Sequence, residues 1–408
     1  MKTIKPRIAI LHYAAPPTIG GVETTLAAHA RLFADHDYRV QVIAGRGNRF
    51  DRRVPLTLIA DVDSRSPRVT QVNAELARGI VSDEFNRVTH RLTRRLNQAL
   101  AQTEVLIVHN AMSLHKNLAL TAALKNLNDV RRVRLIAWCH DFAWSDPQYA
   151  SDLHAGFPWD LLKQPWSNAR YVVVSQARKQ ELENLWSGHC QEIAVVPAGI
   201  DVLEFLGVSK KTRDWVDRLN LLDAAPLLLL PARVTRRKNI ERALAIVAAL
   251  RKLGCQAKLV VTGPPGPHNP TNAAYLQQLF ALRESLGAQD AITFLYELGS
   301  VGAAQLRDLY LLADGLLFPS EREGFGIPLL EAGLSRLPIF CAELPPLRET
   351  GQTYAHYFSP EDSVDVVARR MMDYFQSDAI FQMKRRVVME YSWEEIFRRK
   401  IEPLLESA

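Results

Sequence analysis

The chain has 408 residues, of which 48% are hydrophobic and 23% charged, and its formal net charge is +6. This composition argues against disorder, and the mild charge suits a small anionic substrate or a weak contact with an acidic membrane surface without requiring nucleic acid. The four cysteines show neither metal-ligand spacing nor a disulfide pattern, and no apolar run approaches the ~18 residues of a membrane span. We therefore expect a cytoplasmic protein, with association to a membrane surface left open.

Short apolar runs alternate with helical patterns along the chain, which is typical of a doubly wound parallel sheet. In the first half we expect strands at Arg7–Tyr13, Arg39–Ala44, Glu104–His109, Val133–Trp138, Tyr171–Ser175 and Glu192–Val196, with helices at Val22–Asp35, Phe85–Ala101, His115–Leu127 and Gln176–Leu185. The second half repeats the rhythm with strands at Pro226–Ala232, Ala257–Thr262, Ala291–Phe294, Gly315–Phe318, Pro338–Cys341 and Ala355–Phe358, and helices at Asn239–Leu253, Asn272–Leu286, Ala303–Leu312 and Pro328–Ser335.

These patterns predict an α/β protein with two Rossmann-like domains, because the length exceeds a single typical core. We place the first domain at residues 1–205, the second at 206–390 and a helix at 391–408. The strand pattern lapses at residues 201–225, where we expect a linker. Ligands of such sheets bind beyond the carboxyl ends of the strands, so the residues that follow the strands are the candidates for function.

The segment from Glu323 to Glu331 combines two carboxylates with a glycine-rich loop and a proline at an expected helix start. Pro328 suits the first helical turn, because its missing N–H would be unpaired there in any case. Gly324 and Gly326 allow the backbone to approach a ligand, and the helix start offers free N–H groups. This arrangement can hold a polyhydroxylated ligand at two points and leave room for an anion.

Further candidates stand at other expected strand ends. Gly20 and Gly21 directly precede a helix, where backbone N–H groups can bind a phosphate or a sugar, although a tight turn explains them equally well. His140 follows a strand, and its imidazole can donate to a sugar hydroxyl. Arg233 and Lys238 stand five residues apart across a strand-to-helix turn, which suits two cations that converge on one diphosphate. Between these two cations, the neighbouring arginines 236 and 237 are expected to be solvated, or at most to contribute to the local field.

Tryptophans and other aromatic residues gather in the stretch that follows Trp138, which shows no helical or strand period and indicates a long ordered loop. Flat rings beside polar groups suit stacking on sugar faces, so Trp144 is a candidate contact for an acceptor. A lid with its own small hydrophobic core is an equal alternative. His109, His115 and Lys116 are further candidates to face an anionic or sugar-bearing acceptor.

The ordered set of motifs resembles the retaining glycosyltransferases of family 4 over nearly the whole chain. The resemblance rests on the glutamate-x7-glutamate motif at Glu323 and Glu331, the Gly-Gly-x-Glu loop at Gly20, the His-Asp pair at His140, and the Arg and Lys-Asn signature at Arg233 and Lys238, where Ala232 stands in place of the usual glycine. It implies a GT-B fold in which two Rossmann-like domains face a central cleft, with the acceptor on the first domain, the donor on the second and a terminal helix that crosses back to the first.

The resemblance also implies transfer of mannose or glucose from GDP-mannose or UDP-glucose, with retention of the anomeric configuration and without a metal or other cofactor. The expected catalytic residues are His140, Arg233, Lys238 and Glu323. The expected donor-binding residues are Gly20, Gly21, Gly263, Gly324, Phe325, Gly326, Ile327 and Glu331. For the acceptor, which could be a sugar, a phosphorylated small acid or a glycolipid, we assign Asp141, Trp144, His109 and Lys116.

Two alternatives to this enzyme differ in the residues they need. A catalytically silent nucleotide-sugar-binding or scaffold protein of the same fold would be expected to lack Lys238, Arg233 or Glu323, and all three are present. A nicotinamide-dependent dehydrogenase would need a G-x-G-x-x-G turn, which the first glycine pair does not supply. The Asp-x-Asp triplets at residues 35–37 and 61–63 match the metal-binding pair of other glycosyltransferases, but so short a match occurs easily by chance and we assign no metal to them.

Overall fold

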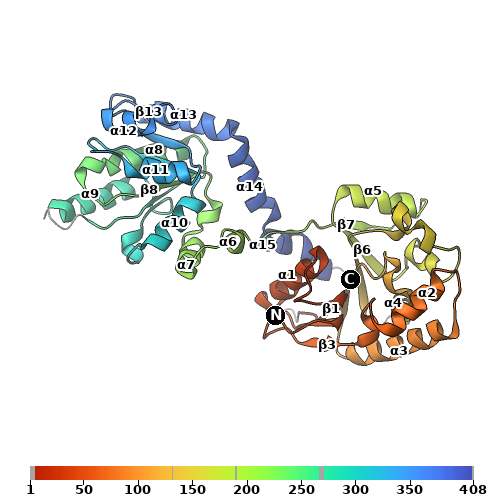
Figure 1. Cartoon of the computed structure of the whole chain (residues 1–408). Helices are drawn as coiled ribbons and strands as arrows, with labels where there is room; N and C mark the ends of the chain where they lie inside the picture. Colours follow the sequence, from red (N-terminus) through yellow and green to blue (C-terminus); the bar gives the residue numbers. More distant parts are fainter. Residues whose placement is uncertain (1–4, 131, 189–190, 266–270, 407–408) are drawn as a thin grey trace. The chain divides into compact units, whose positions relative to one another are not determined.

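The computed structural model describes residues 5–130, 132–188, 191–265 and 271–406. The chain divides into two compact units, a first unit of Met1–Ile200 with Tyr391–Ala408 and a second unit of Asp201–Glu390. Each unit is built on a parallel sheet with helices on its faces (Figure 1), which confirms the expected α/β fold class. The first unit ends at Ile200, a few residues before the boundary that we expected at residue 205.

The first unit contains a seven-stranded sheet in the order β3-β2-β1-β4-β5-β6-β7. Its strands are β1 (Ile8–Ala14), β2 (Val40–Arg46), β3 (Leu56–Leu58), β4 (Val105–His109), β5 (Arg134–Cys139), β6 (Ala169–Val173) and β7 (Ile193–Val195). Its α-helices are α1 (Gly21–Asp35), α2 (Pro67–Leu76), α3 (Asp83–Ala99), α4 (Leu118–Asp129), α5 (Gln176–Leu185), α15 (Trp393–Ile396) and α16 (Pro403–Glu406). The central strands β1 and β4 are buried throughout, because helices cover both faces of a parallel sheet.

The second unit contains a six-stranded sheet in the order β10-β9-β8-β11-β12-β13. Its strands are β8 (Leu227–Leu230), β9 (Lys258–Val261), β10 (Ile292–Phe294), β11 (Gly315–Phe318), β12 (Ile339–Ala342) and β13 (His356–Phe358). Its α-helices are α6 (Val202–Phe205), α7 (Lys210–Leu219), α8 (Ile240–Lys252), α9 (Thr271–Ser285), α10 (Ala303–Leu312), α11 (Ile327–Leu334), α12 (Pro345–Gly351), α13 (Val364–Ser377) and α14 (Ala379–Tyr391).

Every strand expected from the sequence is present, and β3 is an addition. With three residues, β3 gives too short an apolar run to stand out. The linker expected at residues 201–225 is instead largely helical, since it forms α6 and α7. Thr212 and Trp215 of α7 are buried, and the Asp308 carboxylate of α10 accepts hydrogen bonds from the Ser209 N–H (2.9 Å) and the Thr212 hydroxyl (2.8 Å). This segment is therefore a packed part of the second unit.

The chain returns to the first unit through residues 391–406. The Trp393 ring packs against Gly199, where an added Cβ would lie 2.6 Å from the ring, and its centroid lies 5.4 Å from that of the His29 ring. Further along, the Phe397 ring stacks on His36 with centroids 4.1 Å apart. Only glycine leaves room for the indole at residue 199, so this contact fixes the point at which the chain re-enters the first unit.

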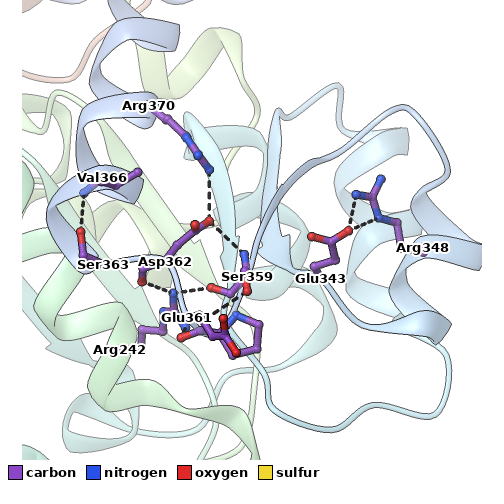
Figure 2. Close-up of polar contacts among 10 residues, drawn as sticks. Arg242, Glu343, Arg348, Ser359, Glu361, Asp362, Ser363, Val366 and Arg370 are labelled. Carbon is purple, nitrogen blue, oxygen red and sulfur yellow. Dashed lines mark hydrogen bonds and ion pairs between the residues drawn. The ribbon is translucent and has the colours of Figure 1, made fainter.

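In the second unit, Arg242 of α8 fixes the turn that follows β13. Its guanidinium donates to the carbonyl oxygens of Ser359, Pro360 and Asp362, each at 2.8 Å (Figure 2). The Asp362 carboxylate in turn accepts from the Ser359 N–H at 3.0 Å and from Arg370 of α13 at 3.1 Å. One arginine thus satisfies three backbone acceptors and ties the start of α13 to α8, against which it packs.

Candidate active site

Histidines mark the carboxyl ends of three neighbouring strands in the first unit. Strands β1, β4 and β5 lie side by side, and His12 lies near the end of β1, His109 ends β4 and His140 directly follows β5. Parallel strands end at the same edge of a sheet, so these side chains meet there. The sequence motifs singled out His140 and His109 but not His12, which precedes the Gly20 turn without a motif of its own.

Hydrogen bonds fix which ring nitrogen of each histidine carries the proton. The Nδ1 atom of His109 lies 3.0 Å from Nε2 of His140, and Nδ1 of His12 lies 3.0 Å from the His109 carbonyl oxygen, which can only accept. The Nε2 atom of His109 is buried and has no partner among the described residues. An unpaired buried acceptor is less costly than an unpaired N–H. We therefore assign the His109 proton to Nδ1, which donates to His140, and the proton of neutral His140 to its Nδ1.

Burial keeps this histidine group uncharged at neutral pH. It lowers the pKa of His140 to about 4. On α1, His29 packs against the ring of His109, and burial, with a contribution from the charge of His140, lowers its pKa to about 3. Burial is also the main cause of the lowered pKa values of His12 and His109. A neutral imidazole at residue 140 can donate a hydrogen bond without carrying a charge.

We expect the protein to lose stability as the pH falls below about 6.5. The folded-state pKa of His29 is about 3, so the unfolded chain takes up a proton that the folded chain does not, and His29 alone should cost ~2 kcal/mol of unfolding free energy between pH 7 and pH 5. The substitution His29→Leu also removes two buried ring nitrogens that have no partner among the described residues. Measured by urea unfolding, the unfolding free energy of the variant should fall by ~2 kcal/mol less between pH 7 and pH 5 than that of the unmodified protein. An equal fall in both proteins would contradict the expectation.

Helix α1 begins directly at the glycine pair. No side chain caps it, so the N–H groups of its first turn remain available to a ligand. A Cβ on Gly20 would lie 2.3 Å from the Glu23 carboxylate, and Glu23 Oε1 lies 3.8 Å from Nε2 of His12. Because that carboxylate already occupies the positive end of the helix, sugar hydroxyls suit this turn better than a phosphate does.

The residues assigned to the acceptor divide into two groups. His109 is fully buried, which contradicts a direct contact with an acceptor; its Nδ1 atom is instead hydrogen-bonded to His140. Asp141 is exposed and forms an ion pair with Arg178 of α5 at 3.2 Å. Lys116 is exposed. The difference in exposure arises because His109 ends a buried strand, whereas Asp141 and Lys116 lie in the segments after the strands.

The aromatic loop after β5 contributes chiefly to the protein core. Phe142, Trp159 and Trp166 are between 2% and 3% exposed, which favours the alternative of a lid with a hydrophobic interior over a row of rings open to sugars. Trp144 is half-buried, its Nε1–H donates to the Trp159 carbonyl at 3.2 Å, and the Lys163 ammonium lies 4.3 Å from its ring centroid. Its indole N–H is therefore already engaged, and a cation lies over its ring.

In the second unit, the central feature is an ion pair between Lys238 and Glu323. Strands β8 and β11 are neighbours; Lys238 ends a 3-10 turn after β8, and Glu323 lies in the loop after β11. The ammonium lies 2.5 Å from Glu323 Oε1, and the two side chains are only 11% and 9% exposed. Burial lowers the pKa of Lys238, and the hydrogen bond to Glu323 opposes that effect. Arg237, expected to be solvated, lies 3.4 Å from Glu323 Oε2 and donates to the Arg322 carbonyl at 3.2 Å.

This ion pair leaves hydrogen-bonding capacity unused. An ammonium has three N–H donors and a carboxylate about four acceptor positions. Lys238 gives one donor to Glu323, while Glu323 accepts from Lys238 and, at longer range, from Arg237. The pair can thus remain intact while the lysine donates to a phosphate and the glutamate accepts from hydroxyl groups.

A cavity of about 590 Å³ opens beside the ends of β8 and β9, and Arg233, Gly263, Tyr296 and Ser300 are among the residues that line it. A Cβ on Gly263 would lie 2.6 Å from the Cα of Arg233 and still closer to the preceding carbonyl oxygen. Only glycine permits this approach, and it holds the backbone of Arg233 at the cavity wall. The volume suits a nucleotide-sized ligand. The sequence analysis named Arg233 and Gly263 but not Tyr296 or Ser300, which belong to no recognised motif.

The glycine-rich loop leads from Glu323 into α11. Gly326 has a φ of +97°, a conformation that favours glycine, and the Thr350 hydroxyl fixes the loop by donating to the Phe325 carbonyl at 2.6 Å. The side chains of Phe325 and Ile327 are 52% and 61% exposed, and an added Cβ on Gly324 would meet nothing within 4 Å. The loop therefore has a fixed backbone and open side chains.

Glu331 is oriented by a residue that the sequence did not indicate. The buried Tyr310 of α10 donates its hydroxyl proton to Glu331 Oε2 at 2.6 Å. Burial and the Glu331 carboxylate both raise the pKa of this tyrosine, so that it remains a donor. The other carboxylate oxygen is left for a ligand. Since residues 310 and 331 lie on different helices, no local pattern could reveal their contact.

Both aspartates of the Asp-x-Asp triplet at residues 61–63 are engaged by arginines. Asp61 forms ion pairs with Arg91 at 3.0 Å and Arg68 at 3.9 Å, and Asp63 pairs with Arg46. In the part of the chain that the structure describes, no group of three His, Cys, Asp or Glu side chains could hold a metal ion. Nor does any helix in the described ranges have the length and apolar character needed to cross a membrane.

Two family models match the two halves of the chain. Residues 19–203 match "Glycosyltransferase Family 4", and residues 212–391 match "Glycosyl transferases group 1". Together with the two doubly wound sheets, these matches define the class of the protein: it is a glycosyltransferase of the GT-B fold and of the family 4 type.

The chain is also similar to proteins whose names describe the synthesis or transfer of sugar groups. The chain is 24% identical over 365 residues to the mannosylglucosylglycerate synthase of Petrotoga mobilis, covering 83% of this chain and 82% of that protein. It is 23% identical to the enzyme of the same name from Thermotoga maritima, covering 83% of this chain and 80% of that one. A shorter match, 28% identical over 42% of this chain and 40% of the relative, is to the D-inositol 3-phosphate glycosyltransferase of Actinosynnema mirum.

Proposed function

We propose that the protein transfers a hexose from a nucleoside diphosphate sugar to an acceptor hydroxyl, with retention of the anomeric configuration and without a metal ion. The observation that carries this proposal is the shielded Lys238–Glu323 ion pair at the ends of β8 and β11, in the same unit as the cavity lined by Arg233. The names of the similar synthases include a mannosyl group, which favours GDP-mannose as donor, with UDP-glucose as the alternative.

Loss of the diphosphate leaving group requires positive charge where negative charge grows. In this proposal Lys238 and Arg233 supply it, together with N–H groups at the start of α11. The ammonium can use the donors that Glu323 leaves free, and its limited exposure strengthens the interaction by excluding water. No metal ion is needed for charge balance in this proposal, because the two cations, Lys238 and Arg233, would offset the charge of a dianionic diphosphate.

Glu323 is a poor covalent nucleophile in this arrangement. Its carboxylate is held by Lys238 and Arg237, and such neutralisation lowers the reactivity of its lone pairs. We assign it to the hydroxyls of the transferred sugar, and Glu331, oriented by Tyr310, to the ribose hydroxyls of the donor. Attack by the acceptor hydroxyl on the same face as the departing diphosphate then retains the configuration, and a phosphate oxygen of the leaving group takes the proton of that hydroxyl.

The first unit supplies polar groups to the sugars. His140 presents its Nδ1–H as a donor to a hydroxyl of the transferred sugar, and the backbone N–H groups that follow Gly20 and Gly21 bind hydroxyls as well. Phe325 and Ile327, whose side chains are open, provide apolar contacts to the donor.

Thermal unfolding of the full chain with nucleotide sugars tests this proposal. GDP-mannose, UDP-glucose and ADP-glucose are compared with their free nucleotides, with and without EDTA. A ligand at 100 times its dissociation constant should add ~2.7 kcal/mol of stability. We expect one nucleotide sugar to stabilise the protein selectively and EDTA to leave that shift unchanged. The absence of a shift with every nucleotide sugar would refute the proposal, and a shift lost with EDTA would refute its metal-free form.

A further inference from the structure

The first unit contains a second cavity, of about 270 Å³, formed by segments that are distant in the sequence. Its wall includes Ser64 after β3, Asn73 of α2, Lys116 before α4, and Asp152 and Trp159 of the aromatic loop. Since one water occupies about 30 Å³ of liquid, the volume matches roughly nine waters. That size suits a small polyol with one charged group rather than a nucleotide.

Positive charge is concentrated at one side of this cavity. Lys116 is exposed and immediately precedes Asn117, whose side chain caps α4 by accepting from the Leu120 N–H at 3.1 Å. The cavity therefore lies at the N-terminal end of a 12-residue helix, where the dipole favours an anion. No described carboxylate lies within ion-pair distance of the Lys116 ammonium, so its charge is available to a ligand.

The wall of the cavity also carries an acceptor of hydrogen bonds. The Asp152 carboxylate, 46% exposed, lies 3.6 Å from Nε2 of His115, and the Asp152 carbonyl accepts from the Trp159 Nε1–H at 3.2 Å. The His115 ring packs on Tyr149 with centroids 4.7 Å apart. The bond from Trp159 fixes the backbone of Asp152 and so keeps its carboxylate at the cavity wall.

The loop that runs from His109 at the end of β4 to Lys116 also contacts His140, because the Asn110 Oδ1 atom accepts from the His140 N–H at 2.7 Å. Burial is the main cause of the lowered pKa values of both His115 and His12, and the charge of Lys116 contributes to both. A single ammonium thus lies within electrostatic reach of the cavity wall and of His12, which in turn contacts Glu23 and His109. One short loop thus joins Lys116 to the strand ends at which His140 stands.

We propose that this cavity binds the acceptor and that the acceptor is a compact polyhydroxylated anion, with its carboxylate or phosphate at Lys116 and a hydroxyl at Asp152. The proposal rests on the glycosyltransferase function proposed above and narrows its acceptor. In this proposal neither Trp144 nor His109 contacts the acceptor directly, since His109 is buried and the indole N–H of Trp144 is already hydrogen-bonded. The names of two of the similar proteins point to the same chemistry, since one contains a glycerate and another an inositol phosphate.

Calorimetric titration of the full chain with matched probes tests this site. D-glycerate and D-inositol 3-phosphate supply the carboxylate and the phosphate, and glycerol and myo-inositol are their neutral counterparts. We expect at least one anion to bind more tightly than its counterpart, and Lys116→Met to weaken that anion about tenfold or more while leaving the neutral polyol unchanged. The anion that Lys116→Met weakens shows whether the acceptor carries a carboxylate or a phosphate. Asp152→Asn should weaken the neutral polyol more than the anion, because it also removes a negative charge from the cavity wall.

Lys125→Met is the matched control. It also removes one positive charge, but from α4, where Lys125 pairs with Asp129 at 2.6 Å. Because Lys125 does not line the cavity, this variant should leave all titrations unchanged. The proposal is overturned if no anion binds better than its neutral counterpart, or if Lys116→Met and Lys125→Met behave alike. Stabilisation by the nucleotide sugar should persist in Lys116→Met. If the nucleotide sugar still stabilises Lys116→Met and this variant binds the anion as tightly as the unmodified chain does, the acceptor site alone is refuted. If no nucleotide sugar stabilises the unmodified chain, the glycosyltransferase proposal itself is refuted.

Discussion

Lys238→Met is expected to lower kcat/KM for the sugar donor by about 100-fold or more, which is the usual effect of removing one group that stabilises charge in a transition state. The physical reason is that the Lys238 ammonium, 11% exposed, faces the leaving group in a site with little water. A surface lysine would lose far less, because solvent would screen its charge. Steady-state kinetics with the donor identified by thermal unfolding, and with product formation as readout, measures the change.

The same substitution is also expected to destabilise the protein, because it leaves the Glu323 carboxylate shielded and without its main partner. The double variant Lys238→Met with Glu323→Gln separates the two effects. Removal of both charges should restore most of the stability lost in the single variant, but none of the activity. If the double variant regained activity together with stability, the lysine would have only a structural role. Arg251→Met is the control. It breaks an exposed ion pair between Arg251, near the C-terminal end of α8, and Asp290, and it should change neither the stability nor the activity appreciably.

His140→Ala is expected to reduce kcat by about 100-fold, and His109→Leu by about tenfold, although His109 touches no substrate. The reason is the 3.0 Å hydrogen bond between the two rings, which keeps the proton of His140 on Nδ1. Without it, the proton of His140 distributes between both nitrogens, and part of the population presents an acceptor to the sugar hydroxyl in place of a donor. The donor dissociation constant should change less than kcat.

A conservative replacement distinguishes this positioning role from a packing role. In His109→Asn the side-chain amide can place an N–H near the position of Nδ1, so this variant should retain more activity than His109→Leu. The ¹⁵N chemical shifts of the His140 ring report the position of its proton independently of activity. We expect the Nδ1–H form in the unmodified protein and in His109→Asn, and a mixture in His109→Leu. Equal activity losses in both variants, with no change in these shifts, would show that His109 acts only through packing.

Much of the architecture could be predicted because its signals are local. A strand of a buried parallel sheet, such as β8 with four successive leucines, shows itself within a few residues. Helix starts also have local signals, such as Pro328 in the first turn of α11. Helix α7 differs from the expected linker because only three of its ten residues, Thr212, Trp215 and Val216, are buried, which leaves a weak apolar pattern in the sequence. Strand β3 is too short to give any signal.

The candidate site was predictable only as a set of positions. Strand ends pointed to His140, Arg233, Lys238 and Glu323, since turns and glycines mark where a chain leaves a sheet. Nothing local indicated that Arg237 would reach Glu323, because an arginine in a charged run is usually solvated.

By itself, the sequence determined the type and order of the elements and the residues at the ends of the strands, since hydrophobic period and turn chemistry act over a few residues. Only the tertiary structure decided which of those residues meet. Lys238 contacts Glu323 across 85 positions, Tyr310 orients Glu331 from another helix, and His109 turned from a candidate substrate contact into the buried partner of His140. Such contacts depend on how whole helices and strands pack, and the burial that accompanies them sets the charge state of each group.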